Sequence, residues 1–175
     1  MIWNENASKN HIGRPNRRRS SRTGFRDRDR LEHGGYAPRG RKAEDGRINA
    51  RYNLVELSTS SYPARTRRNI KESDGTVIFS LERVLSGGTK LTQDYANKLR
   101  KPVLHIYDTR KAQTFNPDSL RLELTDFLRS NKIEVLNVAG PRESKEPGVY
   151  VWTLTMLRSL NRAASVGIPQ KQVAG

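Results

Sequence analysis

The chain contains no cysteine and only three histidines, which are scattered along it. Without cysteine it forms neither a disulfide framework nor a thiolate metal site, and the sequence offers no other cluster of metal ligands. No apolar run approaches the roughly 18 residues of a membrane span, and the N-terminus lacks the apolar core of a signal peptide. We therefore predict a cytoplasmic protein with no membrane partner and no metal site.

Hydrophobic residues are also scarce for a compact α/β protein. They make up 34% of the 175 residues, and the mean hydropathy is −0.82. The length suits one domain with a substantial core, whereas the low hydropathy indicates that part of the chain lies outside that core. We predict a folded domain over residues 31–162, preceded by a separate segment at 1–30 and followed by a flexible tail at 163–175.

Positive charge is abundant, with a formal net charge of +15. Residues 1–30 hold nine Lys or Arg against three acidic residues, and eight arginines fall between Arg14 and Arg30. Taken as written, this segment is a disordered basic arm that could neutralise nucleic-acid phosphates without sequence specificity. Nucleic-acid binding is therefore one functional alternative, and it depends on residues 1–30 being the genuine product of the gene.

From residue 31 onward, short apolar runs alternate with amphipathic segments. Val77, Ile78 and Phe79 stand together, as in a strand that is buried on both faces. His105 has no second ligand nearby and is predicted to be a packed strand residue. Strands that alternate with helices predict a Rossmann-like, doubly wound α/β fold with a mainly parallel sheet and helices on both faces. The predicted strands are 52–57, 76–80, 103–107 and 133–138, and the predicted helices are 62–72, 91–99, 116–131 and 149–160.

Two glycine-bearing loops follow predicted strands, one at residues 86–89 and one at 137–144. In a parallel sheet both loops lie at the carboxyl edge, where ligands bind. Glycines let backbone amides approach an anion, a helix N-terminus attracts it, and an arginine adds a forked donor. The predicted ligand- or phosphate-binding residues are Gly87, Gly88, Thr89, Thr92, Arg39, Asn137, Gly140, Arg142 and Ser144.

Three separated motifs carry a resemblance to a known family. They are GGYAPRGRKAEDG at 34–46, NIKESDGTVIFS…SGGTKLT at 69–92 and LNVAGPRESKEPGVY at 136–150. In this order they resemble the putative molybdenum carrier family, circularly permuted members of the SLOG superfamily of Rossmann-like nucleotide-binding domains. The resemblance implies a carrier that binds a nucleotide-like or phosphate-bearing small molecule at its glycine loops. The implied cofactor is molybdenum cofactor or a nucleotide, and the implied assembly is a homo-oligomer.

The family begins with a strand and a GGQTG-type loop, which this chain lacks as written. Codons for residues 9–30, read from their second base, can give KIISGGQTGADRRALDFAIATG, which has the pattern of a strand, a glycine loop and an amphipathic helix. The protein sequence dictates most first and second bases, and only the third bases are free. We therefore predict that the first β-α unit is missing or replaced, because residues 9–30 are its out-of-frame translation. The nucleotide sequence of the gene tests this prediction.

Hydrolysis of a nucleotide or an N-glycosidic bond is the other functional alternative. Related SLOG phosphoribohydrolases resemble a PGGxGTxxE pattern, in which a Glu after the loop performs the chemistry. This chain reads SGGTKLTQDY, with no Glu at the matching place and only Asp94 nearby. Glu143 is the other carboxylate near the predicted site, and it is a candidate general base if burial raises its pKa. The sequence therefore favours carriage or sensing of a ligand over catalysis.

Overall fold

The computed structural model describes residues 11–12, 34–44, 46–108 and 116–165. Its helices are η1 (Arg39–Arg41), α1 (Tyr62–Lys71), α2 (Gly87–Lys98), α3 (Pro117–Ser130) and α4 (Val149–Ser165). Its strands are β1 (His11–Ile12), β2 (Tyr36–Ala37), β3 (Lys42–Ala43), β4 (Gly46–Arg47), β5 (Val55–Glu56), β6 (Gly75–Ser80), β7 (Val103–Tyr107) and β8 (Leu136–Ala139).

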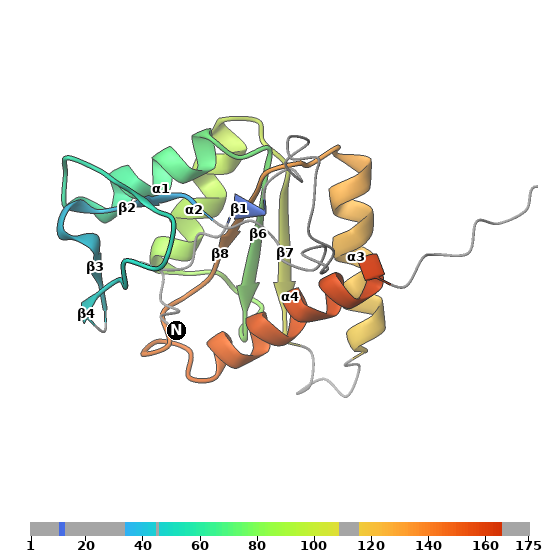
Figure 1. The fold of residues 1–175 in the computed structure, drawn as a ribbon. Coiled ribbons are helices and arrows are strands. Elements are labelled where there is room, and N and C mark those ends of the chain that lie inside the picture. Colours follow the sequence, from blue (N-terminus) through green and yellow to red (C-terminus); the bar gives the residue numbers. More distant parts are fainter. Residues whose placement is uncertain (1–10, 13–33, 45, 109–115, 166–175) are drawn as a thin grey trace, which may run out of the picture.

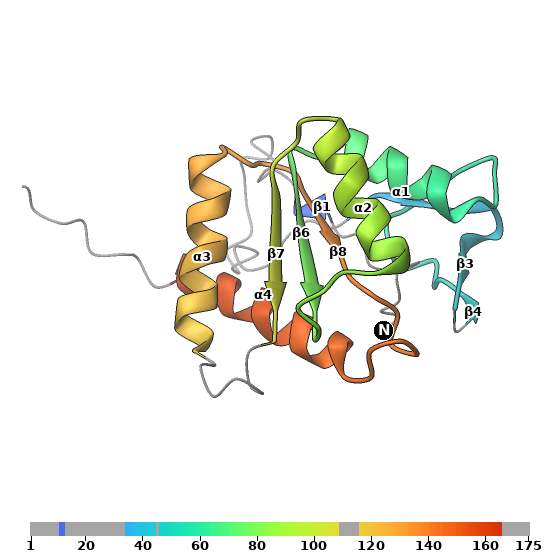
Figure 2. The ribbon, with the colours of Figure 1, turned by 180° about the vertical axis from the view of Figure 1, so that it is seen from behind.

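The main sheet has the strand order β1-β8-β6-β7, and β6 pairs in parallel with both β7 and β8. Every residue of β6 is buried, as its run of apolar side chains predicts. Helices α1 and α2 cover one face of this sheet, and α3 and α4 cover the other (Figures 1 and 2). The predicted Rossmann-like α/β architecture with helices on both faces is confirmed.

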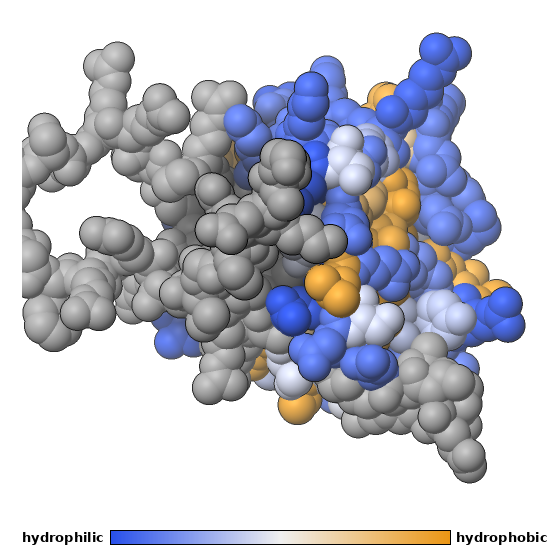
Figure 3. All heavy atoms as spheres, turned by 90° about the vertical axis from the view of Figure 1, so that its right-hand side faces the viewer, coloured by the Kyte–Doolittle hydropathy of each residue, from blue (hydrophilic) through white to orange (hydrophobic). Residues whose placement is uncertain are grey.

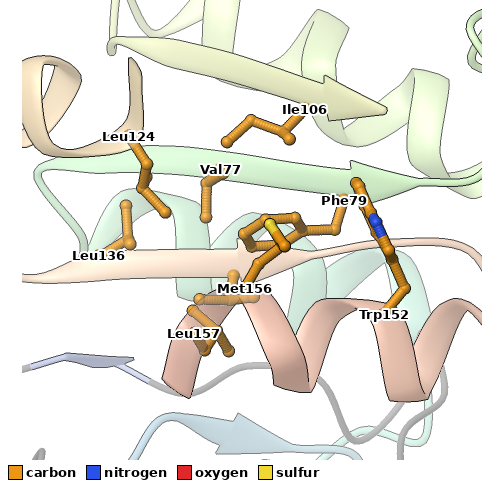
Figure 4. Packing of buried hydrophobic residues seen from close by; sticks show 9 residues of the cluster. Val77, Phe79, Ile106, Leu124, Leu136, Trp152, Met156 and Leu157 are labelled. Carbon is orange, nitrogen blue, oxygen red and sulfur yellow. The ribbon is translucent and has the colours of Figure 1, made fainter. Parts of the chain in front are cut away.

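The main core lies between the sheet and the α3–α4 layer. Val77 and Phe79 point to this side of β6, because alternate residues of a strand face the same way. Phe79 packs edge-on against Trp152 of α4, with ring centroids 5.6 Å apart (Figure 4). The nine buried residues of this cluster are Val77, Phe79, Ile106, Leu124, Leu136, Val138, Trp152, Met156 and Leu157.

The sheet face under α1 and α2 carries buried polar side chains. Asn137 of β8 donates from Nδ2 to the Thr76 hydroxyl of β6 over 3.2 Å. Further along, the Ser80 hydroxyl lies 2.7 Å from Nε2 of His105 on β7. Burial lowers the pKa of His105, because the charged imidazolium loses hydration. These contacts tie β6 to both of its neighbours by side chains as well as by the backbone ladder.

The outer edge of β8 pairs with β1, whose two residues run antiparallel to it. These two residues fall inside the segment predicted to be a translation of the wrong frame, whereas the rest of residues 1–33 lies outside the described residues. The prediction that the first β-α unit is missing or replaced remains a prediction.

Several boundaries differ from those predicted. Residues 86–89 were predicted as a loop, but Gly87 begins α2, so Gly88 and Thr89 lie in its first turn. The last strand begins at Leu136 rather than at 133, and Asp74 Oδ2 accepts the amides of Glu134 and Val135 just before it. Helix α4 runs on to Ser165, into the segment predicted to be a tail.

The described surface and helices were compared with what a protein or membrane partner would require. On the side where α3 lies, the described surface is mainly hydrophilic, with apolar groups scattered over it (Figure 3). Leu122 of α3 is 54% exposed, and single exposed apolar side chains are ordinary on protein surfaces. Within the described ranges, no helix is long and apolar enough to cross a membrane.

Arg41 organises the loop between β4 and β5. Its guanidinium donates to the carbonyl oxygens of Ile48 and Leu54 over 3.1 and 3.2 Å. It also donates to the carbonyl oxygens of Asn49 and Tyr52 over 3.0 and 2.9 Å. These four hydrogen bonds engage the whole guanidinium with backbone carbonyls of one loop. Arg41 is therefore a structural residue of this loop.

We expect Arg41→Lys to lower the free energy of unfolding by about 2 kcal/mol, because an ammonium group cannot reach four carbonyls as a planar guanidinium does. Amide hydrogen exchange should show the loss of protection over residues 48–54. Arg39→Lys is the matched control, since the Arg39 side chain is exposed on the same 3-10 helix. Equal behaviour of the two variants would contradict this role of Arg41.

We also expect stability to depend on pH through His105. The pKa of His105 is lower in the folded than in the unfolded chain. The neutral side chain therefore contributes fully to the free energy of unfolding above the unfolded pKa of about 6.5. This contribution falls as the pH drops through that value toward the folded pKa, because the unfolded chain takes up the proton first. Chemical denaturation between pH 8 and 5 measures this loss. The His105→Gln variant should show a smaller decrease over the same range, and an identical decrease would show that another group is responsible.

Candidate functional site

The carboxyl ends of β6 and β8 border a cavity of about 500 Å³, here called the loop cavity. The connection from β6 leads directly to the N-terminus of α2, and the loop after β8 runs along the same edge (Figure 2). The volume lies within the roughly 300–1,000 Å³ of small-molecule sites. Its lining residues are Glu82, Val84, Leu85, Ser86, Gly87, Gly88, Thr89, Pro141, Arg142, Lys145 and Glu146.

The first turn of α2 supplies backbone donors to the loop cavity. Ser86 is the N-cap residue, but its side chain makes no capping hydrogen bond, and the first turn carries no acidic residue. Gly87 has a φ of +52°, a conformation that L side chains rarely adopt, so a glycine suits this entry into the helix. The amides of this turn and the positive end of the helix dipole favour an anion.

The loop after β8 supplies side-chain charge. Arg142 and Lys145 line the loop cavity together with the acidic residues Glu82 and Glu146. The Glu146 carboxylate accepts the backbone amide of Leu81, which ties the two loops together. The lining is therefore of mixed charge, and Gly88 and Arg142 combine an amide-rich helix turn with a cation.

A second hollow of about 300 Å³ lies between α1 and α2, here called the helix groove. Gly88 and Arg142 line it as well as the loop cavity. Tyr62 of α1 also lines the groove, and the Arg142 Cζ lies 5.8 Å from the centroid of its ring. The two hollows therefore meet at Arg142.

Four of the nine predicted binding residues line the loop cavity, namely Gly87, Gly88, Thr89 and Arg142. The other five do not appear in the lining of either hollow. Asn137 is buried within the sheet and bonded to Thr76. Asn137 lies two residues before the end of β8, so it is inside the strand and not in the loop at its carboxyl end, where it was predicted.

The remaining predicted residues have structural contacts. The Thr92 hydroxyl donates to the carbonyl of Gly88 over 2.9 Å within α2. Ser144 donates to the Glu44 carboxylate, and Arg39 is exposed on η1, where its amide donates to Thr59 over 2.8 Å. Gly140 lies against β6, because a Cβ there would be only 2.7 Å from the carbonyl oxygen of Phe79.

The two carboxylates considered for catalysis are engaged elsewhere. Glu143 accepts the amide of Gly148 over 2.6 Å and that of Tyr150 over 3.0 Å, so it caps the N-terminus of α4. Asp94 is half-exposed and forms an ion pair with Lys90 over 2.6 Å. Because both Glu143 oxygens accept backbone amides at the start of α4, this side chain is held as a helix cap, away from the lining of the loop cavity. This geometry does not favour Glu143 as a general base.

Three further residues line the helix groove and are not among the predicted binding residues: Tyr62, Leu91 and Tyr95. Leu91 and Tyr95 lie in the helix predicted over residues 91–99, and Leu91 is 63% exposed. Their spacing of four residues places them on one face of the helix. No periodicity tells whether such a face meets the sheet or a groove. Among the described residues, no group of three or more metal-ligating side chains is present.

Comparison with known proteins identifies the family. The family model described as "Circularly permutated YpsA SLOG family" matches residues 25–161. The chain belongs to this family. The SLOG resemblance predicted from the sequence motifs is thereby confirmed, over nearly the same part of the chain. The match begins after most of the segment for which a changed reading frame is predicted.

A solved structure shares the fold of this SLOG protein. It is the crystal structure of the "Putative molybdenum carrier protein" from Syntrophus aciditrophicus SB, with 38% sequence identity and a TM-score of 0.69. The alignment covers 74% of this chain and 79% of the other chain. No match was found among curated proteins. Sequence and structure therefore agree on a SLOG domain similar to a protein that is named as a carrier.

Gly140 and Gly75 both lie close to neighbouring residues, but a Cβ at the two positions would contact different kinds of atom. We expect Gly140→Ala to destabilise the protein by roughly 2–3 kcal/mol, because its Cβ would press on the backbone carbonyl of Phe79. At Gly75 the Cβ would meet the terminal Cδ1 of Ile133 at 2.5 Å, which a flexible side chain can relieve. Gly75→Ala should therefore cost only about 1 kcal/mol.

Chemical denaturation of both alanine variants gives the comparison. If Gly140→Ala proved the milder of the two, the close backbone approach at the end of β8 would not constrain the loop that carries Arg142.

Proposed function

We propose that this SLOG protein binds a phosphate-bearing or other oxoanionic small molecule in the loop cavity and carries it without converting it. The observation that supports this proposal most strongly is the convergence of Gly88 and Arg142 on one cavity. A helix turn without a side-chain cap offers amide donors, and a guanidinium offers two parallel donors to the same anion. Together they match a phosphate or a similar tetrahedral oxoanion.

The named relative suggests the kind of cargo. That protein is called a "Putative molybdenum carrier protein", which makes molybdenum cofactor one candidate ligand of this chain, and the SLOG family of the chain makes a nucleotide the other. The described residues contain no cluster of three or more His, Asp or Glu that could hold a metal. In this proposal the anionic group of the cofactor, rather than its metal, contacts Gly88 and Arg142.

Carriage is preferred to hydrolysis because of the carboxylates. Glu143 caps α4 with both of its oxygens, and Asp94 is paired with Lys90 and lines the helix groove. Neither is among the residues that line the loop cavity. Nucleic-acid binding through the basic arm depends on residues outside the described ranges and gains no support from the site.

Binding of inorganic pyrophosphate, measured by calorimetry at fixed ionic strength, tests the proposal. We expect saturable binding that Arg142→Gln weakens about 10- to 100-fold, since a charge-assisted hydrogen bond contributes about 1.5–3 kcal/mol. Arg129→Gln is the matched control, because Arg129 is an exposed arginine in the last turn of α3. Its affinity should stay within about twofold of the original protein.

The same protein should release neither phosphate nor base from nucleoside phosphates. Pyrophosphate affinity that is equal in the Arg142 and Arg129 variants would contradict the site. Release of phosphate or base, abolished by Asp94→Asn or Glu143→Gln, would instead establish a hydrolase.

A further inference from the structure

The helix groove differs in character from the loop cavity that it adjoins. Its walls present the apolar side chains of Pro63 and Leu91 and the rings of Tyr62 and Tyr95. Leu91 is 63% exposed, although it lies on a helix that packs against the sheet. Exposed charged residues also line the groove, with Arg67 on α1 and with Asp94 and Lys98 one turn apart on α2. The lining therefore combines apolar and aromatic side chains with exposed charged ones.

The Tyr62 ring stands where the groove meets the loop cavity. The Arg65 Cζ and the Arg142 Cζ each lie 5.8 Å from its centroid, within the roughly 6 Å of a cation–π contact. Arg65 is buried, with 1% of its surface exposed, so it fixes the ring from the protein side. Guanidinium planes and phenol rings are the groups on which flat conjugated rings stack.

The two hollows are joined at Gly88 and Arg142, which line both. A ligand whose anionic end contacts these two residues therefore has its remaining part directed toward either hollow. Both hollows have apolar lining residues, Val84, Leu85 and Pro141 in the loop cavity, but of the two only the helix groove is lined by aromatic rings. Its volume of about 300 Å³ is at the lower end of the range for small-molecule sites.

We propose that the helix groove is a second subsite, which takes the planar heterocyclic ring of a ligand whose phosphate lies in the loop cavity. This inference rests on the proposed function, and it defines the ligand class as a ring-bearing phosphate of the nucleotide or pterin type. The apolar and aromatic walls hold the ring, and the exposed Lys98 and the Asp94 oxygen that Lys90 does not bind offer a donor and an acceptor for polar groups on its edge. The phosphate anchors the ligand, and the ring adds the affinity that distinguishes ring-bearing from ring-free phosphates.

The test compares ligands with and without a ring by calorimetry at fixed ionic strength. The ring-free probes are pyrophosphate and ribose 5-phosphate, and the ring-bearing probes are AMP, GMP and a pterin phosphate. We expect at least one ring-bearing probe to bind at least tenfold more tightly than ribose 5-phosphate. If ribose 5-phosphate binds as tightly as all three of them, the ring subsite is refuted while the anion site stands.

The variant Leu91→Gln tests whether the ring of the ligand lies in the helix groove. It should abolish the tenfold preference and leave pyrophosphate affinity within twofold. Leu122→Gln is the matched control, because Leu122 is also an exposed helical leucine, at 54%, but on α3 across the sheet. Equal effects of the two variants on the ring-bearing probe would overturn the inference.

Two other results have distinct meanings. If no probe binds, pyrophosphate included, the proposed function fails and the ring subsite fails with it. If Leu91→Gln changes the sedimentation coefficient and not the preference for the ring, the groove is a contact between copies of the chain, which would overturn the ring subsite alone.

Discussion

The parallel pairing of β6 with both β7 and β8 is the constraint on which the site depends. Three parallel strands end at one edge, so the connections that follow β6 and β8 meet there. Gly140 makes this convergence close, since its missing side chain lets the end of β8 lie against the carbonyl of Phe79. The N-terminus of α2 and the loop that carries Arg142 thereby come to border one cavity.

Much of the fold follows from local sequence pattern. The run around Val77 predicts a buried central strand, and Ser61 caps α1 as its position before Pro63 indicates. The boundary of β8 was less predictable, because Ile133 has strand-forming character but lies in a connection that Asp74 fixes from a distant part of the chain. Such a long-range hydrogen bond leaves no periodic signal in the sequence.

Site residues were predictable where the direction of the strands fixes their position. They were less predictable where the orientation of the side chain decides whether it reaches the cavity. Gly88 and Arg142 follow parallel strands, so topology brings them together. Asn137 has a suitable chemistry for a ligand, but the strand pleat turns it onto the sheet toward Thr76. Glu143 likewise looked available, although its oxygens meet the first amides of α4. Tyr62 was missed because its neighbours come from a separate helix and loop.

The cap on α4 has a consequence for the residue beside it. Glu143 holds the start of a helix on the opposite face of the sheet, and the amides of Lys145 and Glu146 donate to the Arg142 carbonyl. These hydrogen bonds hold the backbone at Arg142 and on its C-terminal side. For the proposed anion site, ordering the arginine on binding would therefore cost side-chain entropy but little backbone entropy.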